Sequence, residues 1–182
     1  VYKRQGFKNM ATMMRDLLTV GGKHKISNVM TIWAKPVVNA AIATVDLDNG
    51  VLVEEDGYTD DGVLKVKPWE GTKPAFIVQT VEEEQLLTDL GERDYKCFYN
   101  KAGEPLRLFR VETGIRQESS NYTVKGGITP KLGAEVCYKT ADKTFCIGET
   151  AGSGIISVGK LVGIETDFGF NAGTTTYAVE YK

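Results

Sequence analysis

The segment that decides the fold is AEVCYKTADKTFCIG, residues 134–148. Two short runs rich in strand-forming side chains flank Thr140-Ala141-Asp142-Lys143, a polar stretch of the length that joins neighbouring antiparallel strands. With a four-residue turn at these positions, Tyr138 lies opposite Phe145 and Cys137 lies opposite Cys146. The segment therefore predicts a β-hairpin with one aromatic pair and one thiol pair facing across its two strands.

The chain has three cysteines, Cys97, Cys137 and Cys146, and no C-x-x-C pair. An odd number argues against a complete disulfide framework of the secreted kind. Directly opposite residues have Cβ atoms about 4.5–5.5 Å apart, so two alternatives stay open for Cys137 and Cys146. They form a bridge after oxidation, or they stay as two small buried thiols. We expect all three thiols to be buried, and reduced when the protein is made.

The next segment, GIISVGKL at 154–161, fits the G-x-x-x-x-G-K core of a phosphate-binding loop. That loop needs a Ser or Thr after the lysine to hold Mg²⁺, and here Leu161 follows Lys160. The residues between the glycines are largely β-branched and favour a strand over an anion-binding turn. We therefore predict a strand whose glycines mark bulges or a close approach of backbones, and no nucleotide site.

Short extended segments separated by Gly, Pro, Asn and Asp continue this pattern from residue 29 onward. In LRLFRVE, residues 106–112, strand alternation places Leu106 and Leu108 on one face and Arg107, Phe109 and Val111 on the other. One helix is predicted inside the body, over VEEEQLLTDLGE at 81–92, because glutamates precede the apolar residues and Gly91 supplies a stop. The fold class is mainly β, a small β-barrel or β-sandwich over residues 29–182 with this one short internal helix.

Seven carboxylates lie between residues 46 and 61 with no Lys or Arg among them: Asp46, Asp48, Glu54, Glu55, Asp56, Asp60 and Asp61. Clustered carboxylates suit a hard cation such as Ca²⁺, but the spacing fails the EF-hand pattern. Asn49-Gly50 stands between ATVDL and VLVEE, which favours a hairpin with a two-residue turn. We expect a turn and a solvated loop here, with contact to a cation or a basic partner as the alternative.

Residues 1–28 form a separate N-terminal arm with the opposite charge. Six basic side chains stand against Asp16, a net charge of +5, so the remaining residues carry −7 of the total of −2. Apolar residues at 10, 13, 14, 17 and 18 lie on one face of a helix, and Gly21-Gly22 ends it. A short amphipathic helix is marginal alone, so we expect this face to dock on its own body or on a neighbouring subunit. The predicted partner-binding residues of the arm are Lys3, Arg4, Lys8, Met10, Met13, Met14, Leu17 and Leu18.

Catalysis has little support in the sequence. His24 is the only histidine, which excludes a histidine-rich metal site and leaves little for nucleophilic chemistry. Carboxylate pairs such as Glu112 and Glu118 occur in nearly any chain with this many acids. We expect no enzyme activity, no catalytic residues, no cofactor and no metal. Nucleic acid is an unlikely partner too, because the arm carries few aromatics among its cations.

Targeting signals are also missing from the sequence. No apolar run approaches the roughly 20 residues that span a bilayer, so no membrane partner is expected. The basic N-terminus lacks the apolar core and the cleavage site of a secretory signal, so we expect no export by that route.

A β-rich body with a basic N-terminal arm resembles the head decoration, or capsid cement, proteins of tailed bacteriophages. The phrases that carry the likeness are NGVLVEEDG, VKPWEGTKPAFIVQT and KLGAEVCYKTADKTFCIGETAGSGIISVGKLVGIETD, over residues 49–80 and 131–167. The resemblance implies a structural virion protein, assembled in the host cytoplasm, that binds the major capsid protein or other virion subunits and stabilises the head. It also implies a homo-oligomer, often a trimer.

Two other roles remain alternatives. The basic, helix-prone arm also suits a tail-tube or head-fibre subunit. A carbohydrate-binding β-module would use exposed aromatic side chains, for which Trp33, Trp69, Tyr58 and Tyr122 are candidates. We expect core packing or burial at a strand edge for each of these four aromatics instead.

Overall fold

The computed structural model describes residues 27–31, 34, 36–81, 85–86, 93–94, 98–166 and 175–182. These residues form fourteen strands, and none of them lies in a helix. The mainly β fold class is thus confirmed. The strands are β1 (Ser27–Val29), β2 (Pro36–Ala43), β3 (Leu52–Tyr58), β4 (Leu64–Pro68), β5 (Phe76–Val78), β6 (Gln85–Leu86), β7 (Arg93–Asp94), β8 (Pro105–Arg110), β9 (Arg116–Ser119), β10 (Tyr122–Val124), β11 (Glu135–Lys139), β12 (Thr144–Ile147), β13 (Ile155–Glu165) and β14 (Thr176–Tyr181).

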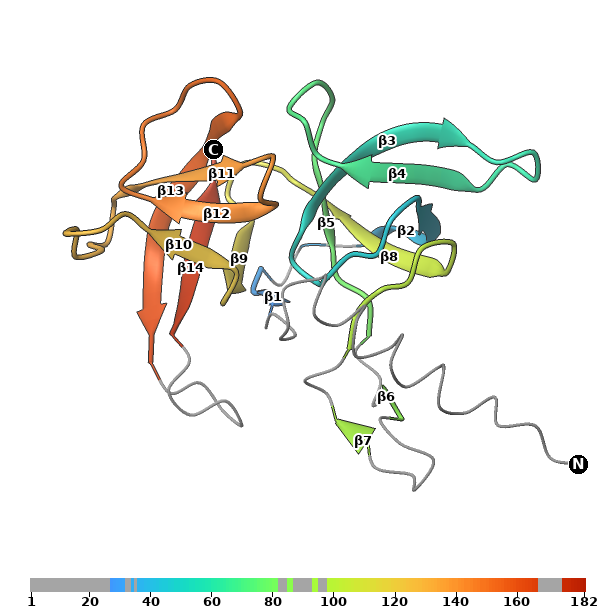
Figure 1. The fold of residues 1–182 in the computed structure, drawn as a ribbon, viewed down its shortest axis with the longest axis horizontal. Coiled ribbons are helices and arrows are strands. Elements are labelled where there is room, and N and C mark those ends of the chain that lie inside the picture. The colour runs from blue at the N-terminus through green and yellow to red at the C-terminus, as the bar shows by residue number, and fades with distance from the viewer. Residues whose placement is uncertain are drawn as a thin grey trace, which may run out of the picture.

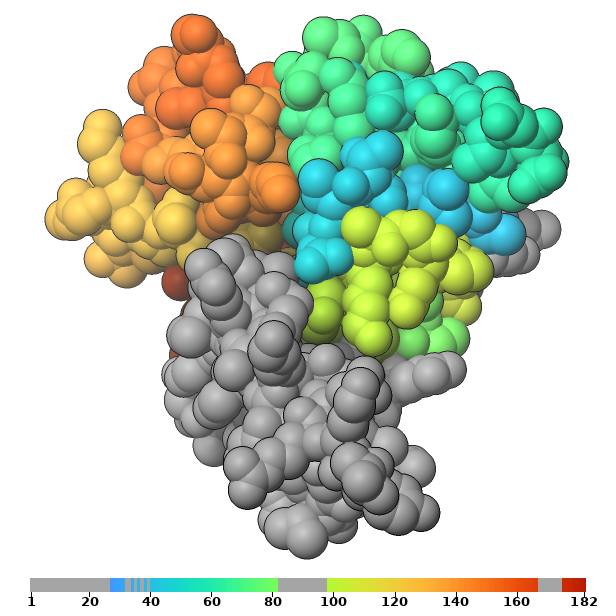
Figure 2. All heavy atoms as spheres, turned by 45° about the vertical axis from the view of Figure 1, so that its right-hand side comes forward, coloured from blue at the N-terminus to red at the C-terminus, as the bar shows by residue number. Residues whose placement is uncertain are grey.

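Two larger sheets lie side by side (Figure 1). One is a closed barrel in the order β2-β4-β3-β5-β8, and the other is a seven-stranded sheet in the order β1-β9-β14-β13-β11-β12-β10. Strands β6 and β7 pair only with each other. The space-filling view shows the barrel strands directly against the residues of the larger sheet (Figure 2). The body therefore combines a barrel with an open sheet.

Strand alternation explains how the barrel serves two cores. Val53, Val78 and Leu108 point into the barrel, where small aliphatic side chains fill its interior. Leu52, Ile77 and Phe109, their neighbours in sequence, point outward and pack on the larger sheet. The predicted alternation in LRLFRVE is confirmed, since Leu106 and Leu108 line the barrel while Phe109 lies in the other core. Barrel and sheet are thus joined by a continuous apolar layer.

The hairpin predicted from residues 134–148 is present in the larger sheet. β11 and β12 are antiparallel, with Tyr138 opposite Phe145 and Cys137 opposite Cys146. The turn closes through Lys143, whose φ of 54° is the only positive value at a residue other than glycine in the described part of the chain. Cys137 and Cys146 are free thiols and fully buried, as expected. Cys97 lies outside the described residues.

The segment that matches a phosphate-binding loop is the strand β13, as predicted. Its register shifts twice, once against β11 and once against β14, so the predicted bulges are also present. A Cβ added at Gly159 would lie 2.1 Å from the backbone oxygen of Glu180 on β14. This glycine therefore permits a close approach of two backbones, as expected.

Two local predictions were wrong. Asn49-Gly50 forms a turn, but the strands on either side do not pair with each other: β2 pairs with β4 and β8, and β3 pairs with β4 and β5. The internal helix over 81–92 is not supported, because Gln85–Leu86 in its middle is strand β6, paired with Arg93–Asp94. The arm helix lies outside the described residues.

Replacing Gly159 with Ala should lower the free energy of unfolding by about 1–3 kcal/mol, as other overpacked sites do. The new methyl group meets backbone, which cannot rotate away. Gly126→Ala is the matched control, because no atom lies within 4 Å of its added Cβ and its change should stay within about 0.5 kcal/mol. Urea denaturation of both variants measures the difference, and equal stability of the two would contradict the role given to Gly159.

Candidate interaction surface

The predicted arm residues Lys3, Arg4, Lys8, Met10, Met13, Met14, Leu17 and Leu18 all lie outside the described residues. The structure does fix the point where the arm joins the body. Ser27 and Asn28, its last two residues, belong to β1 and pair with Ser119 and Glu118 of β9. The described body thus begins at one edge strand of the larger sheet.

Buried polar side chains anchor this starting point between the two sheets. The amide of Gln117 donates to the Ser27 hydroxyl at 3.2 Å and to the Gly50 carbonyl at 3.0 Å, and it accepts a hydrogen bond from Tyr181. Gln79 donates to the Ser27 carbonyl at 3.1 Å. Because these groups are shielded from water, each bond avoids the cost of an unpaired buried polar atom. The attachment of β1 is therefore specified by both sheets.

Asn49 explains why the turn signal at Asn49-Gly50 did not mark a hairpin. Its side chain is buried. The side-chain amide donates to the Thr80 carbonyl at 2.9 Å and accepts from the Thr80 N–H at 3.1 Å, so it makes the same pair of bonds as a neighbouring strand backbone would. Asn100 also donates to its oxygen at 3.1 Å. The side chain joins three separate segments of the chain, a task that local sequence does not reveal.

The acidic run of residues 46–61 is divided among different roles. Asp46 accepts from the Ala102 N–H, Asp48 accepts from the Asn49 N–H, and the carboxylates of Asp56, Asp60 and Asp61 are exposed along the β3–β4 hairpin. No group of three or more potential metal-binding side chains occurs within the described ranges. The expected turn and solvated loop account for four of these side chains, whereas Asp48 is buried. Contact with a basic partner stays a prediction.

Glu54 is also buried, since its side chain is 0% exposed. Its carboxylate accepts hydrogen bonds from the backbone N–H groups of Glu70, Thr72 and Lys73 and from the Thr72 hydroxyl at 2.7 Å. Lys67 lies 3.5 Å away. Burial raises the pKa of Glu54, but these donors outweigh it and hold the pKa below 4.5. The buried charge therefore holds the loop of residues 69–75 against the barrel.

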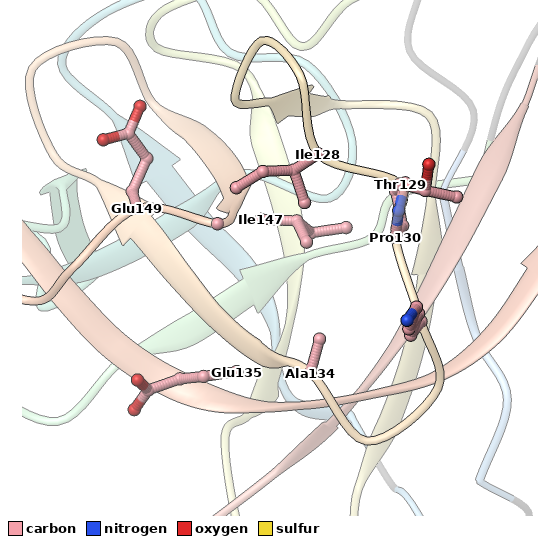
Figure 3. A pocket seen from close by; sticks show the side chains of 9 residues that line it. Ile128, Thr129, Pro130, Ala134, Glu135, Ile147 and Glu149 are labelled. Atoms are coloured by element: carbon pink, nitrogen blue, oxygen red, sulfur yellow. The ribbon is translucent and has the colours of Figure 1, made fainter.

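A groove of about 610 Å³ lies at the other end of the larger sheet, formed by three segments (Figure 3). The loop after β10 supplies Ile128 and Pro130, the start of β11 supplies Ala134, and the end of β12 supplies Ile147. Ile128 is 42% exposed, and Leu132 on the same loop is 66% exposed. Sequence reasoning missed this groove, although two large apolar residues in GGITPKLG, a stretch rich in turn residues, were its available signal.

Two carboxylates line the same groove. Glu149 and Glu135 point outward along one side of it, away from Thr129 and Pro130 (Figure 3). Lys139 contacts Glu149 at 3.3 Å, and Lys182 contacts Glu135 at 3.5 Å. A hydrogen bond from Ser157, aided by Lys182 and only partly offset by desolvation, lowers the pKa of Glu135. The groove therefore combines an apolar floor with a charged rim.

The aromatic candidates for sugar binding differ in their exposure. Trp69 packs on the core and donates its indole N–H to the Lys73 carbonyl at 2.8 Å, and Tyr122 stacks on Phe145. For these two the expected burial is confirmed. Tyr58 is 61% exposed, so the expectation was wrong there, and Trp33 lies outside the described residues. Among the described residues, Tyr58 is thus the one candidate aromatic that is exposed enough to stack on a sugar.

Glu112 and Glu118, the example of a carboxylate pair in the sequence, lie in different environments. Glu118 is buried and accepts a hydrogen bond from Thr176, while Glu112 is exposed.

The described residues also contain no helix long and apolar enough to cross a membrane. The groove is thus the feature of the described body that best suits a binding role.

A model of the YonC prophage protein family matches residues 20–180, most of the chain. The chain belongs to the YonC prophage protein family. No curated protein and no solved structure matches it. Membership in this family supports the phage-related part of the prediction from sequence, and it covers both sheets of the body.

In the YonC-family chain, Glu54→Gln should lower the free energy of unfolding by about 1.5–3 kcal/mol, the range for buried hydrogen bonds to a charged group. A neutral amide cannot accept from three N–H groups as a carboxylate does. Since the folded pKa of Glu54 is lowered, its stabilisation is present above pH 4.5 and is lost as the pH falls through the folded pKa. Stability should therefore fall more steeply in acid for the unaltered protein than for Glu54→Gln.

Glu55→Gln serves as the control for this experiment, because it changes the neighbouring, partly exposed carboxylate. It should change stability by less than about 0.5 kcal/mol. Urea denaturation between pH 3 and pH 7 gives both comparisons, with Trp69 fluorescence as a local reporter in a Trp33→Phe background. An identical acid profile for the unaltered protein and Glu54→Gln would contradict the role of the buried charge.

Cys137 and Cys146 of the same chain should react slowly with thiol reagents in the native protein. Burial raises the pKa of both thiols, that of Cys146 to about 11, so the reactive thiolate is scarce at neutral pH. In a Cys97→Ser background, mass spectrometry should find both thiols unlabelled until urea is added. Rapid native labelling would refute burial, and a mass lower by two hydrogens without reductant would reveal the bridge.

Proposed function

We propose that this protein is a structural component of a tailed-phage particle that binds the capsid lattice as a decoration or cement subunit and stabilises the head. The observation that carries the proposal is membership in a prophage family over residues 20–180. The sequence resemblance to capsid cement proteins supports the same class. A tail-tube or head-fibre subunit is the nearest alternative within it.

The architecture suits a structural role better than a catalytic one. Barrel and sheet share a buried apolar layer, and buried hydrogen bonds of Gln117 and Asn49 lock the segments between them. The pocket that the structure offers is an open groove with an apolar floor. Such a groove fits a segment of another protein, and its lining residues form no grouping of nucleophile and base.

The N-terminal arm is the proposed docking element toward another virion subunit, either the major capsid protein or a neighbouring copy. Its charge of +5 opposes the −7 of the remaining residues, so attraction over long range speeds the encounter. Partial burial of Met10, Met13, Met14, Leu17 and Leu18 supplies on the order of 5 kcal/mol before ordering costs, at roughly 25 cal/mol per Å². Exposed charge pairs add about 0–1 kcal/mol each and weaken in salt.

The double variant Met14→Asp with Leu18→Asp should lower the copy number in particles at least tenfold, because it breaks the apolar face and keeps the basic residues. Tyr58→Asp with Val81→Asp is the matched control, since it adds the same charge at two exposed positions of the body. Quantitative mass spectrometry of purified particles, with each variant supplied in place of the unaltered chain, gives the measurement. Absence of the unaltered chain from particles would overturn the proposed function, and normal occupancy of the double variant would place the binding surface on the body.

A further inference from the structure

The groove at residues 128–149 has the features of a site for an apolar segment of protein. Its volume of about 610 Å³ lies within the usual 300–1,000 Å³ of ligand sites. Ile128, Ile147 and Ala134 project into it (Figure 3). Leu132, on the loop that forms one wall, leaves most of its side chain in solvent. An occupant with apolar side chains would cover both exposed residues of the loop.

One side of the groove carries hydrogen-bond acceptors beside the apolar floor. Glu135 and Glu149 flank the apolar floor on one side (Figure 3), and Lys131 also lines the groove. Each carboxylate already contacts one lysine, but a carboxylate has room for several donors. Lys131, Lys139 and Lys182 offset these two carboxylates, so the rim carries no excess of negative charge. The carboxylates still offer acceptors to an Arg or Lys that lies next to apolar side chains.

The chain itself contains a segment with this chemistry. Between residues 8 and 18, Lys8 and Arg15 accompany the five Met and Leu side chains of the apolar face. Met is unbranched and adapts to irregular apolar surfaces, which suits a shallow open groove. We propose that the groove receives this segment from a neighbouring copy of the chain, which rests on the docking role proposed above for the arm.

Sheet order favours a neighbouring copy over the same molecule. The described chain begins at β1, the first strand of the larger sheet, while the groove is built at β11, β12 and the loop after β10. Five strand spacings separate β1 from β12, about 24 Å at 4.8 Å each. The nine residues from Leu18 to Ser27 span at most about 30 Å when fully extended. Docking within one molecule thus requires an almost straight path across the sheet.

Docking between copies is head to tail. The β1 edge of one copy lies near the groove of the next, so each copy gives one arm and accepts one arm. Such a contact closes into a ring when the rotation between copies permits. A closed ring of this kind agrees with the homo-oligomer expected from the sequence, and its copies would attach to a lattice together.

The test uses the full chain without other virion proteins and measures mass by light scattering during size-exclusion chromatography. The unaltered chain should form an oligomer. Ile128→Asp with Leu132→Asp should weaken self-association at least tenfold, as should Met14→Asp with Leu18→Asp. The control Tyr58→Asp with Val81→Asp should assemble normally. Leu132→Asp alone serves as a milder second variant, because this side chain is mostly exposed and its change should leave the fold intact.

A mixture of the groove variant and the arm variant shows whether the arm comes from a neighbouring copy. The groove variant keeps an intact arm, and the arm variant keeps an intact groove, so an equimolar mixture should form a dimer that neither forms alone. A monomeric unaltered chain, normal assembly of the groove variant, or no dimer in the mixture would each overturn the inference. If the groove variant assembles normally but is lost from particles, the groove binds another virion protein; the proposed function then survives and this inference does not.

Discussion

The burial of Tyr138 is the constraint on which the joining of barrel and sheet depends. Its side chain is fully buried, its hydroxyl accepts the Leu52 N–H at 3.2 Å, and its ring contacts Trp69 and Phe145. Burial raises the pKa of Tyr138, so the hydroxyl stays neutral. One residue of the β11–β12 hairpin thereby satisfies a backbone donor of the barrel and fills the apolar layer between the sheets. Moving the hairpin register by one residue would remove both contacts at once.

Sequence patterns over a few neighbouring residues predicted the features of this fold that form within such short stretches. The β11–β12 hairpin, the strand β13 and the two faces of β8 follow from turn length, β-branched residues and alternation, all within a few neighbouring residues. The barrel order could not be predicted in this way, because β2 pairs in parallel with β4 and antiparallel with β8, far along the chain. β9 and β10 escaped prediction because they are short, and β9 carries polar residues such as Gln117 that are buried only through contacts with other segments.

The same distinction applies to the candidate site. The arm could be proposed from the sequence because its charge and its apolar spacing are both properties of one continuous segment, and its docking role stays a prediction. The groove was not, because Ile128, Ala134 and Ile147 meet only after β10, β11 and β12 have paired. Glu54 shows a second limit of prediction from local sequence. Among seven carboxylates it looks like part of a solvated run, and only the fold of residues 69–75 around it buries it.

The strand from which the arm departs and the apolar groove lie at opposite ends of the larger sheet. The buried bonds of Gln117 and Ser27 fix the strand from which the arm departs, so the origin of the arm is set relative to the sheet. The groove lies at the other end of that sheet, on a loop that keeps Leu132 and Ile128 available. In the proposed docking between copies, a fixed origin at one end and an apolar receptor at the other would define a repeating distance. A subunit that decorates a lattice needs such a distance, because its spacing must match that of the shell beneath it.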